Sequence, residues 1–407
     1  MRLVDLKFKP GVDKQDTAYS AGDQRKYVDS DFVRFHYGKP ERWGGWQFFP
    51  NPNVTVVGVV RDTHSWIGLD GTRYLALGTD RKLYIYSEGK IYDITPIRES
   101  QALTNPFETT SGSSTVTVTD NSHGAEVGAF VTFDNGSATN VVDGIDFNNE
   151  FEVLTTTTNT FTINAETNAS GSTASGGGSV TAAYQINPGP SASTYGYGWG
   201  TLSWSESTWD EPRSSSSVVI AGRSWSLDNF GEDLIATVLN GGTFIWDTSS
   251  GLATRATALS NAPTTSRFSI VSTDTRHLLI FGTETTIGNA ATQDDLLFRF
   301  SDREDATDYT PVATNEAGSL RITDGSRIVG AVKSTGQILV WTDTSLHGIQ
   351  FVGTPFTFGL RQLTLDEENA AAAQAKLART QKLAPTCTGK KRYISWTYSN
   401  HHTPCFP

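Results

Sequence analysis

The pattern of apolar and polar positions changes character along this chain. From Val54 onward, short apolar runs alternate with turn residues, in the order VTVVGVV, HSWIGLDG, RYLALGTD and KLYIYSEGKIYDITPI. Alternation over four to eight residues between turn signals is typical of β-strands. The strings LDG at 69–71 and SEG at 87–89 fit tight hairpin turns. The pattern therefore predicts a four-stranded antiparallel meander.

A similar unit recurs further along the chain. Residues 233–251 and 326–353 each contain an apolar strand, a Gly or Asp turn and a strand that ends in an aromatic residue. RHLLIFG and DLLFRFSD predict another strand pair. Sheets repeated at spacings of tens of residues favour the blades of a β-propeller, with a series of sandwiches as the alternative. The equivalent second strands of three units would be 83–86, 243–246 and 338–341.

Residues 107–186 have a separate composition, rich in Ser, Thr, Gly and Asn, with their own two-residue alternation. The expected strands are STVTVTD, AFVTFDN, EFEVLTTT, NTFTINAE and GSVTAAYQI. Five short strands with a few aromatic residues suffice for a small fold. We therefore expect an inserted β-barrel or β-sandwich domain.

The alternation of apolar and polar residues that is typical of strands stops after residue 363. TLDEENAAAAQAKLARTQKLA favours a helix, and both cysteines of the chain, Cys387 and Cys405, follow it. A short helical tail, a disordered tail or the product of a frameshift would each explain this change, and each leaves the propeller incomplete. The expected fold is all-β, divided into an extended segment at 1–50, propeller-like parts at 51–106 and 187–363, the insertion at 107–186, and the tail at 364–407.

Composition narrows the possible functions. The 407 residues carry a formal net charge of -11, whereas proteins that grip nucleic acid through its phosphates usually display a basic face. Tight DNA binding is disfavoured, although an acidic wall along which DNA slides is compatible with this charge. No apolar run approaches the roughly 20 residues that span a bilayer, and two cysteines give no disulfide framework. We expect no membrane span and synthesis in a reducing cytoplasm.

Candidate catalytic and metal sites are weak. Walker, Rossmann, nucleophile-elbow and HExxH patterns are absent from the sequence, so we expect no enzyme activity and no cofactor. An acidic cluster could bind a metal, but a solvated turn explains it better. The tail has soft zinc ligands at a spacing that fits no common finger. Three isolated histidines lack a triad context and fit turns or strand edges. The acidic cluster contains Asp302, Glu304, Asp305 and Asp308. The soft ligands in the tail are Cys387, His401, His402 and Cys405. The isolated histidines are His64, His123 and His277.

Tryptophans beside glycines suggest an interface. Tyr and Trp are enriched where a partly polar surface is buried between chains. Packing in the core and a platform for sugar rings are the alternatives. The candidate interface aromatics are Trp43, Trp46, Trp199, Trp204 and Trp209.

The opening string GVDKQDTAYSAGDQRKYVDSDFVRFHYGKPERWGGWQ contains the elements D-x-VRF, G-x-P-E and G-G-W. It resembles the start of tail nozzle or DNA-stabilisation proteins of short-tailed phages, especially marine podoviruses. Residues 298–363 resemble later propeller blades of the same group. The resemblance implies a ring of propeller subunits, six in number, and no catalytic residues.

We therefore expect a structural subunit of a phage short tail, in its nozzle or tube, located in the virion and made in the host cytoplasm. Its partners would be other tail subunits, its own copies and DNA in passage, without tight binding. The alternative is a tail component that binds or depolymerises host polysaccharide, although the paired carboxylates of a glycosidase are not evident. A bacterial propeller enzyme or binding module is disfavoured by the opening motif.

Overall fold

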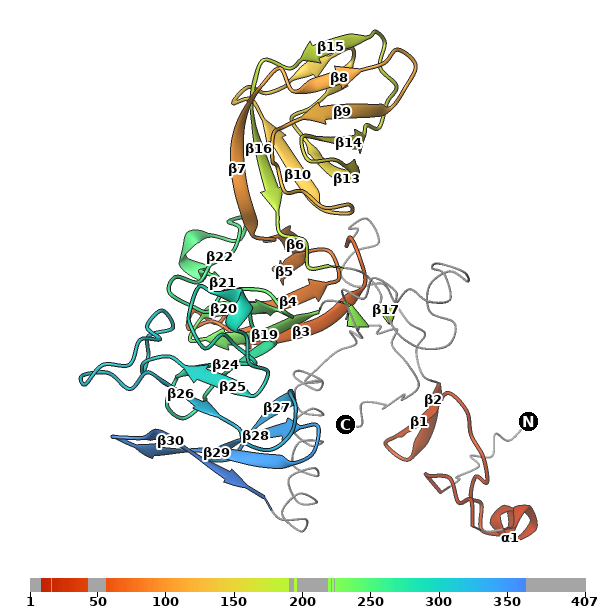
Figure 1. Cartoon of the computed structure of the whole chain (residues 1–407). Helices are drawn as coiled ribbons and strands as arrows, with labels where there is room; N and C mark the ends of the chain where they lie inside the picture. The colour runs from red at the N-terminus through yellow and green to blue at the C-terminus, as the bar shows by residue number, and fades with distance from the viewer. Residues whose placement is uncertain are drawn as a thin grey trace, which may run out of the picture. The chain divides into compact units, whose positions relative to one another are not determined.

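The computed structural model describes residues 9–15, 17–42, 56–189, 194–195, 219–220, 222 and 224–363. The described residues fall into two compact units. The first contains the described residues up to Arg42, and the second contains those from Val56 onward. Strands make up nearly all of the regular structure in the described residues (Figure 1), which confirms the all-β fold. No helix among these residues has the length and apolar character to cross a bilayer.

The first unit contains the helix α1 (Ala18–Asp23) and a hairpin of β1 (Val33–His36) and β2 (Lys39–Arg42). The hairpin turns at Tyr37 and Gly38, which both have positive φ, as a tight two-residue connection requires. Strands of four residues are too short to show a clear alternation. The sequence therefore suggested an extended segment where the chain forms this hairpin.

Four antiparallel sheets of four strands form the body of the second unit, each a meander in chain order. Blade 1 contains β3 (Val60–Ile67), β4 (Arg73–Thr79), β5 (Leu83–Ser87) and β6 (Lys90–Asp93). Blade 2 contains β19 (Trp225–Phe230), β20 (Asp233–Val238), β21 (Thr243–Trp246) and β22 (Thr257–Ala258). Blade 3 contains β23 (Phe268–Val271), β24 (Leu278–Phe281), β25 (Leu297–Phe300) and β26 (Gly318–Arg321). Blade 4 contains β27 (Ile328–Ser334), β28 (Gln337–Thr342), β29 (Leu346–Gly353) and β30 (Thr357–Gln362).

Short elements complete this unit. The 3₁₀ turns are η1 (Thr248–Ser250) and η2 (Ala290–Thr292), and a two-stranded pair is formed by β17 (Thr194–Tyr195) and β18 (Val219–Ile220).

The blades pack face to face in chain order (Figure 1), with the first strands β3, β19, β23 and β27 following one another. Buried apolar clusters join blade 1 to blade 2, blade 2 to blade 3, and blade 3 to blade 4. Within the described ranges, no such cluster joins blade 4 back to blade 1. Over the described residues the arrangement is therefore propeller-like and open between blade 4 and blade 1, in keeping with the incomplete propeller that the sequence predicted.

The interface between blades 1 and 2 uses a reciprocal pair of tryptophans. The indole of Trp66 donates a hydrogen bond to the carbonyl of Glu232 at 2.7 Å, and that of Trp225 donates to the carbonyl of Thr79 at 2.9 Å. A Cβ on Gly78 would lie 2.7 Å from Trp225, so this close approach requires glycine. Each blade thus satisfies a buried donor of its neighbour.

One expected equivalence is wrong. Residues 83–86 and 243–246 lie in β5 and β21, the third strands of their blades, whereas 338–341 lie in β28, a second strand. The inner strands of a blade are covered on both faces, so second and third strands have similar apolar runs. Such runs do not identify their place in the sheet.

Between blade 1 and blade 2 the chain forms one curled sheet of eight strands, here called the module. Its order is β15-β8-β9-β14-β13-β10-β16-β7. The strands are β7 (Ile97–Thr104), β8 (Phe107–Thr109), β9 (Thr115–Thr119), β10 (Phe130–Asp134), β13 (Glu150–Thr156), β14 (Thr160–Asn164), β15 (Thr173–Gly176) and β16 (Ser179–Gln185), with a side hairpin of β11 (Val141–Val142) and β12 (Ile145–Asp146).

The module has its own core, in which the rings of Phe107 and Phe147 stack at 3.8 Å and Phe133 meets Phe107 edge-on. The inserted β fold expected from the sequence is therefore a half-barrel around one core. Its sheet begins at Ile97, because β7 pairs with β16 along seven residues of the latter. The domain boundary expected at residue 107 stays a prediction.

Candidate functional site

Several sequence-predicted sites lie outside the described residues. These are the five candidate interface tryptophans, Trp43, Trp46, Trp199, Trp204 and Trp209, and the tail with its two cysteines and two histidines.

The acidic cluster that follows β25 serves the backbone of its own loop. Asp302 accepts the N–H of Glu316 at 2.8 Å, Asp305 accepts that of Thr307 at 2.8 Å, and Asp308 accepts that of Thr310 at 3.1 Å. Among the described residues, no group of three or more His, Cys, Asp or Glu side chains is arranged to hold a metal ion. The geometry fits a turn stabilised by side chain to backbone hydrogen bonds.

The isolated histidines are more deeply placed than the sequence suggested. His64 lies inside β3, with Nε2 2.9 Å from Oδ1 of Asn229 in blade 2. His277 is fully buried before β24, with Nδ1 2.7 Å from the Thr275 hydroxyl and Nε2 3.3 Å from Glu316. Burial lowers the pKa of His277, although Glu316 acts in the opposite direction.

All four blades meet at Asp228, a buried carboxylate on β19. Its Oδ2 accepts the N–H of Val271 in blade 3 at 2.8 Å and lies 2.6 Å from Nζ of Lys333 in blade 4. His64 of blade 1 lies 3.8 Å from Oδ1. Charged and polar side chains therefore occupy the line where the first strands of the blades converge.

Asp62 repeats part of this arrangement one blade earlier. Its Oδ2 accepts the N–H of Leu227 in blade 2 at 3.0 Å, as Asp228 accepts the N–H of Val271 in blade 3. Each aspartate thus links the first strand of its blade to the first strand of the next. Asp is disfavoured in strands. The Asp within each of the strand-like strings RDTHSW and WSLDNF was therefore a signal in the sequence that these carboxylates have a specific partner.

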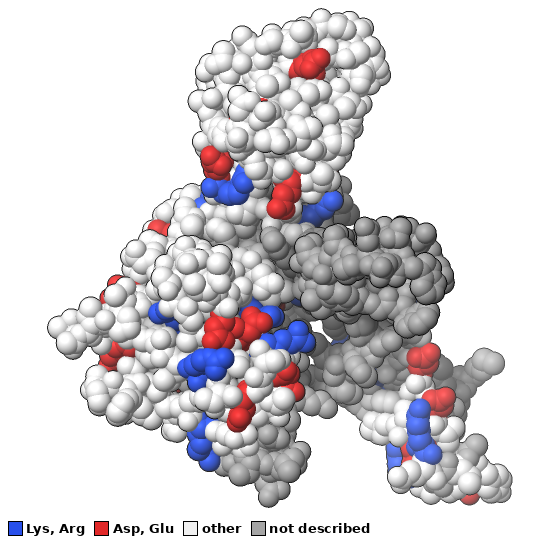
Figure 2. Space-filling model, in the orientation of Figure 1, with Lys and Arg blue, Asp and Glu red and all other residues white. Residues whose placement is uncertain are grey.

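A second polar cluster lies where the module meets the blades. The sequence from Glu99 to Gly189 contains no Lys or Arg, so Arg98 at the start of β7 is the one cation of the module against its several carboxylates. The blades supply the cations: Lys82 contacts Glu150 and lies 2.9 Å from Asp93, and Arg81 lies 2.8 Å from Glu152. Figure 2 shows few charges on the visible face of the module, with Lys, Arg, Asp and Glu gathered at its base.

Lys82 is the centre of this junction, because its side chain is only 3% exposed. Arg255 of blade 2 joins the cluster, 3.3 Å from Asp93 and 3.6 Å from Glu150. Burial opposes ionisation of Asp93, but the charges of Lys82 and Arg255 outweigh it and hold the pKa of Asp93 below its ordinary value. The junction is therefore a matched set of opposite charges.

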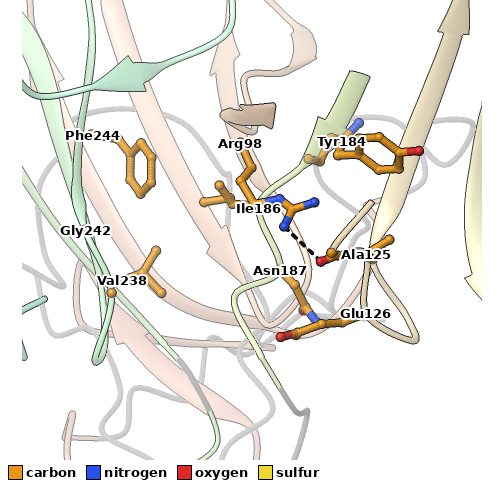
Figure 3. Close-up of a pocket in the computed structure, with 13 residues that line it drawn as sticks. Arg98, Ala125, Glu126, Tyr184, Ile186, Asn187, Val238, Gly242 and Phe244 are labelled. Carbon is orange, nitrogen blue, oxygen red and sulfur yellow. Dashed lines mark hydrogen bonds between the residues drawn. The ribbon is translucent and has the colours of Figure 1, made fainter. Parts of the chain in front are cut away.

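A pocket of about 220 Å³, here called the junction pocket, is lined in part by Gln185, whose amide donates to Glu150 of these ion pairs. Figure 3 shows Phe244 and Val238 of blade 2 on one side, with Ala125, Glu126 and Tyr184 of the module opposite and Arg98, Ile186 and Asn187 between them. Its walls therefore come from four separate segments, at residues 98, 124–129, 184–187 and 238–244, and no local pattern predicted that they meet.

Arg98 is held in place at this pocket. Its guanidinium donates to the carbonyls of His123 at 2.6 Å and Gly124 at 2.8 Å, and it lies over the ring of Tyr184 at 5.7 Å. Nδ2 of Asn187 donates to Glu126 at 2.8 Å. The polar groups are thus positioned before any ligand arrives.

No protein-family model and no curated protein matches this chain. Among solved structures, it is similar to the phage phi92 endosialidase, with 13% sequence identity and a TM-score of 0.23. That match covers 81% of this chain and 48% of the endosialidase, so the chain spans about half of its length. A TM-score this low does not establish a common fold.

Proposed function

We propose that this protein is a structural subunit of the short tail of a bacteriophage, in its nozzle or tube. One observation carries the proposal: the described motif residues at 31–35 and 38–41, which resemble those of tail nozzle proteins, lie in and beside one hairpin. Arg34 lies opposite Glu41 in the β1–β2 hairpin, with Nη2 and Oε2 3.0 Å apart, and the Phe35 ring packs on Tyr27 at 5.4 Å.

The blades support this assignment in a second way. Residues 298–363, which resemble later blades of the same group, span β26 and all of blade 4. A propeller-like body with a separate motif-bearing hairpin suits a subunit that repeats around an axis. We propose a ring of six copies that retains and conducts the packaged DNA.

The path of DNA would then run between subunits. Within one chain, the Asp228, Lys333 and His64 cluster occupies the line where the blades converge, which supports a path between subunits rather than through a single propeller. The formal net charge of -11 suits a wall that repels phosphates. We expect DNA affinity weaker than about 10⁻⁶ M at physiological salt.

Electron micrographs of purified virions, labelled with an antibody against this chain, test the location. Label at the tail supports the proposal, and label confined to the capsid overturns it. Mass measurement of the purified protein separately tests the ring, with six copies expected and a stable monomer at all concentrations counting against assembly.

The alternative is a tail component that depolymerises host polysaccharide. We propose a non-enzymatic role, because the carboxylates of the acidic turn each bind their own loop. Release of reducing ends from host polysaccharide by the purified protein would favour the depolymerase instead.

A further inference from the structure

We propose that the junction pocket binds one pyranose ring of a carbohydrate. The proposal goes beyond a structural role and does not depend on the location of the protein in a tail. It requires only the described residues of the second unit.

The blade 2 side of the pocket is apolar. Phe244 and Val238 line it, and Ile186 continues this surface from the end of the module. A pyranose ring has a face of C–H groups that packs on aromatic and aliphatic side chains as other apolar surfaces do. Phe244 is half-buried and held edge-on by Trp225, with ring centroids 6.4 Å apart, so this wall is preformed.

The module side supplies hydrogen-bonding groups of both kinds. Arg98 donates, the Glu126 carboxylate accepts, and the Asn187 amide does both. Each sugar hydroxyl can both donate and accept a hydrogen bond. Neighbouring hydroxyls of a sugar therefore suit a site that offers donors and acceptors side by side. The bonds of Arg98 to two carbonyls use two of its five N–H groups and fix its orientation.

Size and charge argue against drug-sized and phosphorylated ligands. A volume of about 220 Å³ lies below the roughly 300–1,000 Å³ of sites for drug-sized molecules, which suits one ring of a chain that continues into solvent. Glu126 opposes the charge of a phosphate, so nucleotides and nucleic acid fit poorly. A neutral sugar satisfies both Arg98 and Glu126 without adding charge.

The pocket also depends on the junction. The contact of Lys82 with Glu150 holds the module against blade 1, and the pairing of Arg255 with Glu150 extends this to blade 2. Gln185, which lines the pocket, donates to Glu150 of the same cluster, so the ion pairs connect directly to the pocket wall. A preformed site of this kind loses little entropy on binding.

Saturation-transfer NMR on the full chain tests the proposal. The probes are the methyl glycosides of glucose, galactose, mannose and N-acetylglucosamine, each at millimolar concentration. We expect at least one to receive saturation through its ring C–H protons. Phe244→Ala should weaken its binding about 3- to 10-fold, the loss expected for one aromatic contact. Glu126→Ala, at an exposed residue, should weaken binding without affecting folding.

Phe356→Ala is the matched control, because it removes an aromatic ring that is 75% exposed on blade 4, outside the pocket. Its binding should equal that of the unmodified chain. Absence of saturation transfer to all four glycosides would overturn the proposal. Unchanged affinity in both Phe244→Ala and Glu126→Ala would also overturn it, since the sugar would then bind elsewhere. Neither result bears on the virion labelling.

Discussion

Asp228 of β19 and Lys333 of β27 form an ion pair, with Oδ2 and Nζ 2.6 Å apart, across 105 residues of sequence. The Asp228 side chain is 6% exposed, and Lys333 is one-third exposed. The pair links blade 2 to blade 4, which share no apolar cluster among the described residues. This ion pair is therefore a direct contact between two blades that are not neighbours in chain order.

Replacing Lys333 with Met should lower the free energy of unfolding by about 3 kcal/mol, because it leaves the buried Asp228 carboxylate without its cation. Urea denaturation followed by tryptophan fluorescence measures this. Lys90→Met, at an exposed position of β6, is the control and should change stability by less than about 0.5 kcal/mol. Equal effects of the two substitutions would contradict the role of the pair.

Glu150 and Glu152 provide a matched comparison at the junction, two residues apart on β13. Glu150 contacts the buried Lys82, whereas Glu152 pairs with Arg81 and both partners are more than a third exposed. We expect Glu150→Gln to cost about 1–3 kcal/mol of stability and Glu152→Gln less than about 1 kcal/mol. Thermal unfolding of both variants checks the order, and the reverse order would show that Lys82 is not the centre of the junction.

Stability should fall between about pH 7 and pH 5 because of His277. An unfolded histidine titrates near pH 6.5, and burial holds the pKa of His277 below that value in the folded chain. Below about pH 6.5 the unfolded chain binds a proton that the folded chain does not, so acidification favours unfolding. Urea midpoints at about pH 5, 6 and 7.5 measure the slope.

His277→Gln should make this slope shallower, and the remaining slope should include His347, whose pKa burial also lowers. Asp93 acts in a separate window, because its pKa lies below the ordinary 3.8 and its stabilisation is lost only as pH falls through that range. An unchanged slope in His277→Gln would show that the buried histidine is protonated in the folded chain.

The module should be removable if the cut follows its strands. The N–H of Ile186 donates to the carbonyl of Pro96 at 3.0 Å, so the two ends of the 97–185 segment lie side by side. Replacing 97–185 with a short Gly-Ser linker should leave the blades folded, as judged by near-ultraviolet circular dichroism. Removing 107–186 instead leaves β7 without its partner β16, and we expect that exposed strand edge to promote aggregation.

The local pattern of the sequence predicted much of the secondary structure. The strings around LDG and SEG became the β3–β4 and β5–β6 hairpins, and RHLLIFG and DLLFRFSD became the paired strands β24 and β25. All five strands expected within 107–186 are present, joined by β7, β8 and β15. Strands and tight turns are readable because alternation and turn residues act over a few neighbouring positions.

The tertiary structure decided the candidate sites. Arg98 and Phe244 meet at one pocket, Lys82 is buried between Asp93 and Glu150, and Asp228 faces Lys333, all through the stacking of separate sheets. A side chain's partner across a sheet interface depends on how the blades are rotated and spaced, and no local pattern encodes that geometry. The sequence by itself determined the strands and the all-β class, because those depend on neighbouring residues, whereas packing between sheets determined which charges and apolar surfaces came together.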